Sequence, residues 1–151
     1  MEFLSPYIIA GLAGWVVSQL GKYVVASIKA KRLASYRQLY LSGHMPSAHS
    51  ATTVAVLVVI GLIDGIGSGL FGLAAVFTSV VLYDAMMVRR SSGEQGVALT
   101  AVIKELQASG KLTPEVPLPR VAMGHTPLEV AVGSLLGLLV GIAVYFVMLG
   151  V

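Results

Sequence analysis

The sequence predicts an all-α membrane protein, a polytopic bundle of about four transmembrane helices plus a short amphipathic helix. Only 11% of its 151 residues are charged, whereas a soluble domain has about 25% charged residues. The mean hydropathy is +0.87, and one soluble core of this size could not bury so much apolar surface. We therefore expect residues 1–151 to form a single integral membrane domain.

Four apolar runs supply the predicted spans: residues 6–25, 47–64, 67–88 and 128–151. A bilayer core of about 30 Å needs roughly 20 apolar residues per helix, so the second run is short for a span. The last run carries Gly133, Gly137 and Gly141 at a spacing of four, which lets a neighbouring helix backbone approach closely. That neighbour is either another helix of the chain or a second subunit, so a homodimer sharing this stripe is one alternative.

The short amphipathic helix is expected between the third and fourth runs. Two overlapping capping boxes, Ser91 with Glu94 and Ser92 with Gln95, predict its start. Apolar residues then recur at helical spacing before Gly110: Leu99, Val102, Ile103 and Leu106. Such a helix is expected to lie on the membrane surface or against the bundle.

All ten Lys and Arg residues lie in or beside two loops, at residues 22–37 and 89–120. Because cytoplasmic loops are enriched in Lys and Arg, we expect both loops to face the cytoplasm. The membrane would be a bacterial cytoplasmic membrane or that of an organelle. This topology already accounts for the net charge of +3, so nucleic acid is not an expected partner.

Polar residues gather where the spans meet those loops, and ionisable groups at membrane depth mark functional sites. Pro46-Ser47-Ala48-His49 opens the second span, and a helix start offers free N–H groups and a positive dipole end to an anion. Cations suited to a phosphate group lie in the nearby segments: Lys22, Arg89, Arg90 and Arg120. Asp84 is a candidate counter-ion for them.

Two histidines, His49 and His125, each begin an apolar helix at this face. One could attack phosphorus while the other protonates the leaving oxygen. Glu129 lies one helical turn after His125 and could fix its tautomer, or it could cap the helix together with Thr126; the two roles are compatible. We expect no metal or cofactor. A zinc hydrolase that uses His49, His125 and Glu129 is a further alternative, although these residues lack a recognisable zinc-ligand spacing and the chain has no cysteine.

These motifs resemble the type-2 phosphatidic acid phosphatases. Pro46-Ser47-Ala48-His49 is similar to their Pro-Ser-Gly-His motif. Three longer strings resemble a divergent branch of that superfamily, the acid phosphatase or vanadium-dependent haloperoxidase-related membrane proteins: residues 44–51, 83–90 and 124–130. The resemblance implies that His125 forms a phosphohistidine, that Glu129 stands where the family has Asp, and that His49 is the general acid. It also implies that the Ser47 hydroxyl and the Ala48 amide bind phosphate oxygens.

The chain departs from the family pattern at the phosphate-binding cations. Only Lys22 fits the first motif, in which Lys is followed after six residues by Arg-Pro. In the third motif, Pro119-Arg120 stands where the family has Ser-Arg. Either Arg120 binds phosphate or Arg89 and Arg90 have replaced it, and we favour Arg89 and Arg90 because they lie at a helix end beside Asp84.

The expected function is that of a metal-independent phosphatase acting on a phosphorylated lipid, which would be its partner within the bilayer. Phosphatidic acid, phosphatidylglycerophosphate and prenyl diphosphate all fit the motifs. The alternative is a non-catalytic membrane protein that binds or transports a phospholipid or an anion at the same basic site. A haloperoxidase ranks lower, because the cations that would hold vanadate are incomplete.

Overall fold

The computed structural model describes residues 4–33, 45–119, 121 and 124–149. Their order is α1 (Pro6–Ala30), α2 (Ala48–Ile63), α3 (Gly69–Tyr83), a π-helical turn (Asp84–Val88), α4 (Arg89–Ala108) and α5 (Pro127–Leu149). No strand occurs in these ranges. The predicted all-α class is confirmed.

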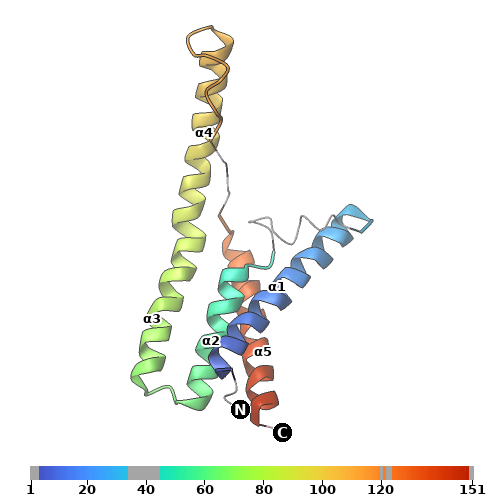
Figure 1. The fold of residues 1–151 in the computed structure, drawn as a ribbon, viewed down its shortest axis with the longest axis vertical. Coiled ribbons are helices and arrows are strands. Elements are labelled where there is room, and N and C mark those ends of the chain that lie inside the picture. Colours follow the sequence, from blue (N-terminus) through green and yellow to red (C-terminus); the bar gives the residue numbers. More distant parts are fainter. Residues whose placement is uncertain (1–3, 34–44, 120, 122–123, 150–151) are drawn as a thin grey trace.

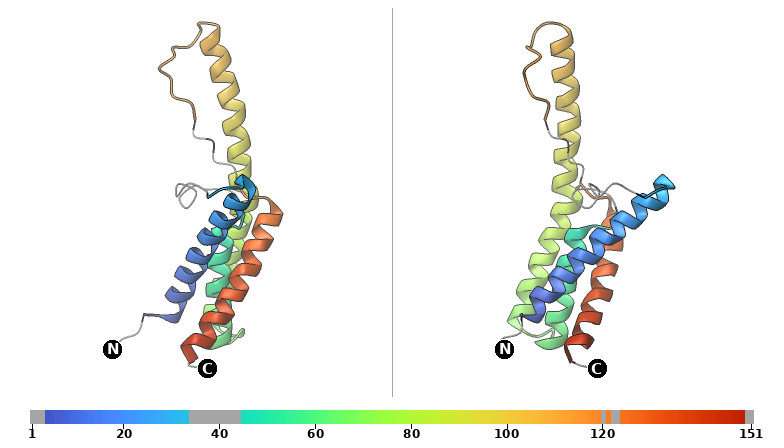
Figure 2. Two further views of the ribbon diagram at one scale, coloured as in Figure 1. Left: turned by 90° about the vertical axis from the view of Figure 1, so that its right-hand side faces the viewer. Right: turned by 45° about the vertical axis from the view of Figure 1, so that its right-hand side comes forward.

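The centre of the bundle is α2, which contacts α1, α3 and α5 (Figure 1). Helices α2 and α5 run in the same direction, whereas α1 and α3 run against them. The start of α2, the start of α5 and the end of α3 therefore come together at one end of the bundle. The start of α1 and the end of α5 lie toward the opposite end (Figures 1 and 2).

The glycine stripe of α5 packs against α2 of the same chain. A Cβ atom on Gly133 or Gly137 would lie 2.5 Å from the carbonyl oxygen of Ser47 or Ala51, respectively. A Cβ on Gly141 would lie 2.8 Å from the Ala55 carbonyl oxygen. The neighbour that the sequence left open is therefore α2, and the stripe is already covered within the chain. A homodimer stays a prediction, but it would need a different face.

The outer surfaces of the bundle are apolar. Large side chains that are at least half exposed occur on every long helix, among them Leu12, Leu20, Phe77, Val80, Leu135, Leu139 and Phe146. Within the described residues, three helical stretches are long and apolar enough to cross a bilayer, namely Pro6–Ala30, Gly69–Ala108 and Pro127–Met148. Helix α2 is a shorter apolar helix of 16 residues. Exposed apolar faces of this extent are stable in lipid, so the chain is an integral membrane protein.

The predicted amphipathic helix corresponds to α4, but it is not a separate element with a start of its own. Ser91 and Ser92 lie inside a helix that continues from α3 through the π-helical turn into α4, so the two capping boxes do not cap a helix start. Ser91 instead accepts a 3.4 Å hydrogen bond from the Gln95 side chain. The capping signal failed because no residue between Tyr83 and Ser91 ends the preceding helix, whose backbone hydrogen bonds simply continue.

The helix does not lie against the bundle, and its position relative to the membrane surface stays a prediction. Helix α4 continues roughly in the direction of α3 and projects beyond the other helices, rather than folding against the bundle or turning across its end (Figures 1 and 2). The continuous stretch Gly69–Ala108 has 40 residues, or about 60 Å of helix at 1.5 Å per residue. The chain therefore carries a long helical projection at the end where the candidate site lies.

Residues 109–119, which follow α4, return along the same projection toward the bundle (Figure 2). The Gln107 side-chain amide donates to the carbonyl oxygens of Thr113, Pro114 and Val116 at 3.3, 3.4 and 3.2 Å. A single side chain thus holds the proline-containing part of the return against the end of α4.

Candidate functional site

The two predicted catalytic histidines lie side by side at the end of the bundle where α2 and α5 begin. The ring centroids of His49 and His125 are 6.4 Å apart, and their planes are inclined by 59°. His49 is exposed, whereas His125 is only 4% exposed. The structure therefore pairs one buried imidazole with one accessible imidazole.

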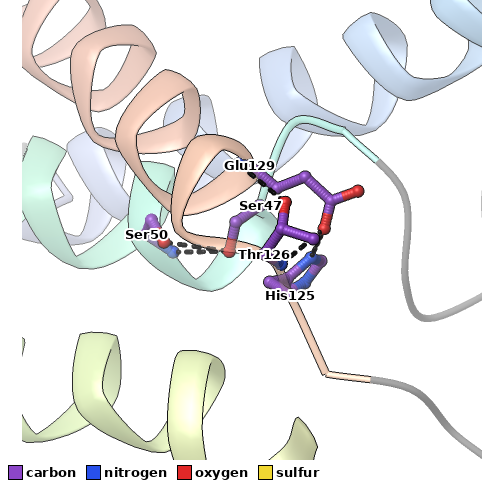
Figure 3. A network of polar contacts seen from close by, with 5 residues as sticks. All are labelled: Ser47, Ser50, His125, Thr126 and Glu129. Atoms are coloured by element: carbon purple, nitrogen blue, oxygen red, sulfur yellow. Dashed lines mark hydrogen bonds and ion pairs between the residues drawn. The ribbon is translucent and has the colours of Figure 1, made fainter.

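A carboxylate orients the buried histidine. Glu129 Oε2 lies 3.2 Å from His125 Nδ1 and accepts the Thr126 N–H at 3.0 Å (Figure 3). In return, the Glu129 N–H donates to Thr126 Oγ1 at 3.3 Å. Glu129 therefore caps α5 and contacts the imidazole at once. A carboxylate that accepts from Nδ1–H leaves the lone pair of the neutral ring on Nε2.

The environment of His125 favours its neutral form. Burial lowers the pKa of the His125 imidazole below its usual 6.5, and the hydrogen bond and charge of Glu129 oppose this shift. The positive charges of Lys22 and Arg89 lower the pKa further. A neutral ring with a free lone pair is the form that can act as a nucleophile.

The backbone around His125 is held by the π-helical turn. The His125 N–H donates a 2.9 Å hydrogen bond to the Ala85 carbonyl oxygen. A Cβ on Gly124 would lie 2.8 Å from the Arg89 carbonyl carbon and would also clash with the Arg90 nitrogen. Roles for Ala85 and Gly124 were not inferred from the sequence, although a glycine next to a candidate catalytic residue can signal close backbone approach.

Ser47 is the N-cap of α2 and is fully buried, with 0% exposure. Its Oγ accepts the Ser50 N–H at 3.4 Å and the Ser50 hydroxyl at 2.9 Å, and its own N–H donates to the Glu129 carbonyl oxygen at 3.1 Å (Figure 3). The Ser47 hydroxyl therefore caps α2, and the Ser47 backbone N–H connects the start of α2 to α5. Its contact with a phosphate oxygen, and that of the 6% exposed Ala48, stay predictions.

The cations of the site come from two sides. Lys22, on α1, is buried and only 6% exposed. The preceding residue, Gly21, lies against Pro46 just before α2, since a Cβ atom on Gly21 would contact the Pro46 ring. The charges of Lys22 and Arg89 act on both His49 and His125. An incoming anion would therefore meet positive charge from α1 and from the start of α4.

Arg89 and Arg90, adjacent in sequence, have different partners. Arg89 Nε lies 2.6 Å from Asp84 Oδ2, across the π-helical turn. Arg90 Nε lies 3.1 Å from Glu94 Oε1 on the next turn of α4. The charges of Arg89 and Asp84 both act on His49. Arg89 therefore influences the histidine pair electrostatically, whereas Arg90 forms its ion pair along α4.

One predicted phosphate ligand, Arg120, lies outside the described residues. The choice between Arg120 and the pair Arg89 and Arg90 therefore stays open. In the described part of the chain, no group of three His, Asp or Glu side chains is arranged to hold a metal ion.

Apolar helices facing lipid, with buried cationic and imidazole groups at one end, define an integral membrane protein with a polar site at its bundle end. The chain belongs to the Divergent PAP2 family, whose model matches residues 3–140. The resemblance inferred from the motifs is thereby confirmed. The chain is also 29% identical over 160 aligned positions to "Uncharacterized membrane protein YuiD" of Bacillus subtilis (strain 168), and the alignment covers 98% of this chain and all of that protein. No solved structure matches the chain.

Proposed function

We propose that the protein is a metal-independent phosphatase that hydrolyses the phosphate headgroup of a membrane lipid. The observation that carries this proposal is the buried His125, which is oriented by Glu129 at 3.2 Å and lies beside His49 with ring centroids 6.4 Å apart. Membership of the Divergent PAP2 family supports it. The buried charge of Lys22 and the paired Arg89 give the same end of the bundle an affinity for phosphate.

In the proposed reaction, His125 Nε2 attacks phosphorus and the bond from phosphorus to the leaving oxygen breaks. His49 donates its proton to that oxygen, so a lipid alcohol leaves, or a lipid monophosphate when the substrate is a diphosphate. Water then attacks the phosphohistidine while the now neutral His49 takes a proton from it. Phosphate departs, His125 is again neutral, and His49 is again protonated.

The proposed topology has four crossings, by α1, α2, α3 and α5, with α4 outside the hydrocarbon core. Both basic loops would face the cytoplasm, in accord with the placement of all ten Lys and Arg residues. The site would then open at the cytoplasmic side of a bacterial or organelle membrane. A lipid could present its phosphate there while its hydrocarbon chains stay in the bilayer.

The direct test is phosphate release by the purified protein from phosphatidic acid, phosphatidylglycerophosphate and prenyl diphosphate, in the presence of a chelator. We expect turnover by the wild type and its loss in His125→Ala and His49→Ala, with vanadate inhibiting the wild type. Lys104→Ala, on the part of α4 far from the site, is the control for loss of activity during purification. Equal release by the wild type and both histidine variants would refute the mechanism.

The second candidate function is binding or transport of a phospholipid or anion without hydrolysis. It is favoured by the complete burial of Ser47, whose hydroxyl is occupied as a helix cap. Retention of a lipid phosphate by the protein with no phosphate release, undiminished in His125→Ala, would support this function over catalysis.

A further inference from the structure

An apolar groove lies between α1 and α5, away from the charged end of the bundle. It has a volume of about 260 Å³ and is lined by eight residues, among them Ala13, Val17, Val140 and Ala143. Every lining residue is apolar. We propose that this groove seats one hydrocarbon chain of the lipid whose phosphate occupies the His125 site, an inference that rests on the proposed function.

The groove shares its two helices with the candidate site. Val17 lies five residues before the buried Lys22 on α1, which is about 7.5 Å along the helix axis. Val140 lies eleven residues after Glu129 on α5, or about 16 Å along that axis. The other lining residues of α5 extend to Val147 and Met148, so the groove occupies the half of the bundle away from the site. A chain attached to a headgroup at His125 would run along α1 and α5 for about 16 Å before it entered the groove.

The size of the groove fits part of one chain. A cavity of about 150 Å³ holds a benzene molecule, so about 260 Å³ has room for about ten carbon atoms. Two chains side by side would not fit. The groove therefore favours lipid phosphates that present a single chain here, such as a prenyl phosphate.

Two small side chains on opposite walls keep the groove open. Ala13 lies on the α1 wall and Ala143 on the α5 wall, so phenylalanine at either position would fill part of the space. Leu12 and Leu139 lie next to these walls on the same helices but are 55% and 57% exposed. Phenylalanine at those two positions would face lipid and leave the groove open, which makes the pair matched controls.

The experiment compares heptaprenyl phosphate, whose single chain is long enough to reach the groove, with glycerol 3-phosphate, which has no chain, using protein in phosphatidylcholine nanodiscs. We expect Ala13→Phe and Ala143→Phe to raise KM for heptaprenyl phosphate at least about tenfold, because several buried CH₂ groups lose their site. The kcat/KM for glycerol 3-phosphate should stay unchanged, as should both substrates with Leu12→Phe and Leu139→Phe. An equal loss on both substrates, or no loss on either, would overturn the proposal.

A binding measurement separates this inference from the proposed catalysis. The inactive His125→Ala protein should retain a fluorescent single-chain phosphate, and adding Ala13→Phe should weaken that binding about tenfold or more. If Ala13→Phe weakened binding of the probe but the wild type released no phosphate, the groove proposal would be supported and the phosphatase function refuted. If heptaprenol displaced the probe as well as heptaprenyl phosphate does, the groove would be a general lipid contact. If Ala13→Phe changed the oligomeric state instead, the occupant would be a second copy; either result would overturn the inference.

Discussion

The His125 backbone N–H donates a 2.9 Å hydrogen bond to the carbonyl oxygen of Ala85. Ala85 belongs to the π-helical turn at the end of α3, whereas His125 belongs to the segment that enters α5. A π-helical turn changes the hydrogen-bond register of a helix, and such turns often occur at functional sites. The position of the proposed nucleophile is therefore set by a helix other than the one it precedes.

We expect Gly124→Ala to reduce lipid phosphate hydrolysis about tenfold or more, because a misplaced catalytic group costs about that much or more. The added methyl group would meet the backbone of Arg89 and Arg90, and backbone cannot move aside as a flexible side chain can. Phosphate release by the purified protein measures the effect. Gly72→Ala is the matched control, since a Cβ there meets no atom within 4 Å; a similar loss in that variant would contradict the prediction.

Gly137→Ala should lower the thermal stability of the bundle by about 1–3 kcal/mol, the usual cost of overpacking a tight contact. The new Cβ would lie 2.5 Å from the Ala51 carbonyl oxygen, where α5 crosses α2. Thermal unfolding in detergent measures the change. An unchanged melting temperature would show that α2 and α5 are less closely packed than the structure has them.

The pH dependence follows from the lowered pKa of His125. Between that pKa and 6.5 the unfolded chain binds more protons than the native protein. The contribution of His125 to the free energy of unfolding is therefore fully present above pH 6.5 and is lost as the pH falls from 6.5 through the native pKa. NMR titration of labelled histidine should place the His125 pKa below 6.5. Glu129→Gln should lower it further, because the carboxylate favours the imidazolium. A rise in that variant would refute the assigned contact.

The two arginines at the start of α4 should differ in effect. Arg89→Ala should raise KM for a lipid phosphate about tenfold, as loss of one charge-assisted contact predicts, because the charge of Arg89 acts on both histidines. Arg90→Ala should change KM less than about twofold, since exposed ion pairs contribute little and Arg90 pairs with Glu94. Initial rates over a range of substrate concentrations test both variants, and equal effects would rule out this division.

Gln107→Ala should loosen the return segment without affecting the bundle. The three carbonyl oxygens that Gln107 serves belong to Thr113, Pro114 and Val116. Limited proteolysis should cut this segment faster in the variant, while the melting temperature of the helices stays the same. Gln95→Ala, which removes one 3.4 Å contact, should leave the cleavage rate unchanged.

Much of the fold could be predicted because lipid imposes strong rules on sequence. Hydropathy located the apolar helices, and the spacing of Gly133, Gly137 and Gly141 indicated a close helix contact. The capping boxes at Ser91 and Ser92 misled because a capping box is a local signal, whereas the continuation of α3 into α4 depends on the helix that precedes it. The partner of the glycine stripe depends on tertiary packing, which the spacing alone does not specify.

The candidate site was predictable in its residue types but not in its contacts. His49, His125 and Glu129 stood out because polar groups are rare beside apolar helices. The contact of the His125 N–H and the burial of Ser47 could not be predicted, because both depend on backbone contacts between segments distant in sequence. The different partners of Arg89 and Arg90 likewise depend on the π-helical turn, which no residue pattern predicted.

Helix α2 has 16 residues and is about 24 Å long, whereas a typical hydrocarbon core is about 30 Å thick. Its neighbours α1 and α5 are longer, with 25 and 23 residues. Such a hydrophobic mismatch is relieved by thinning the bilayer or by drawing polar groups below its surface. The start of α2, where His49 lies, is therefore coupled to bilayer thickness, and lipids with shorter chains should bring their phosphates closer to the histidine pair.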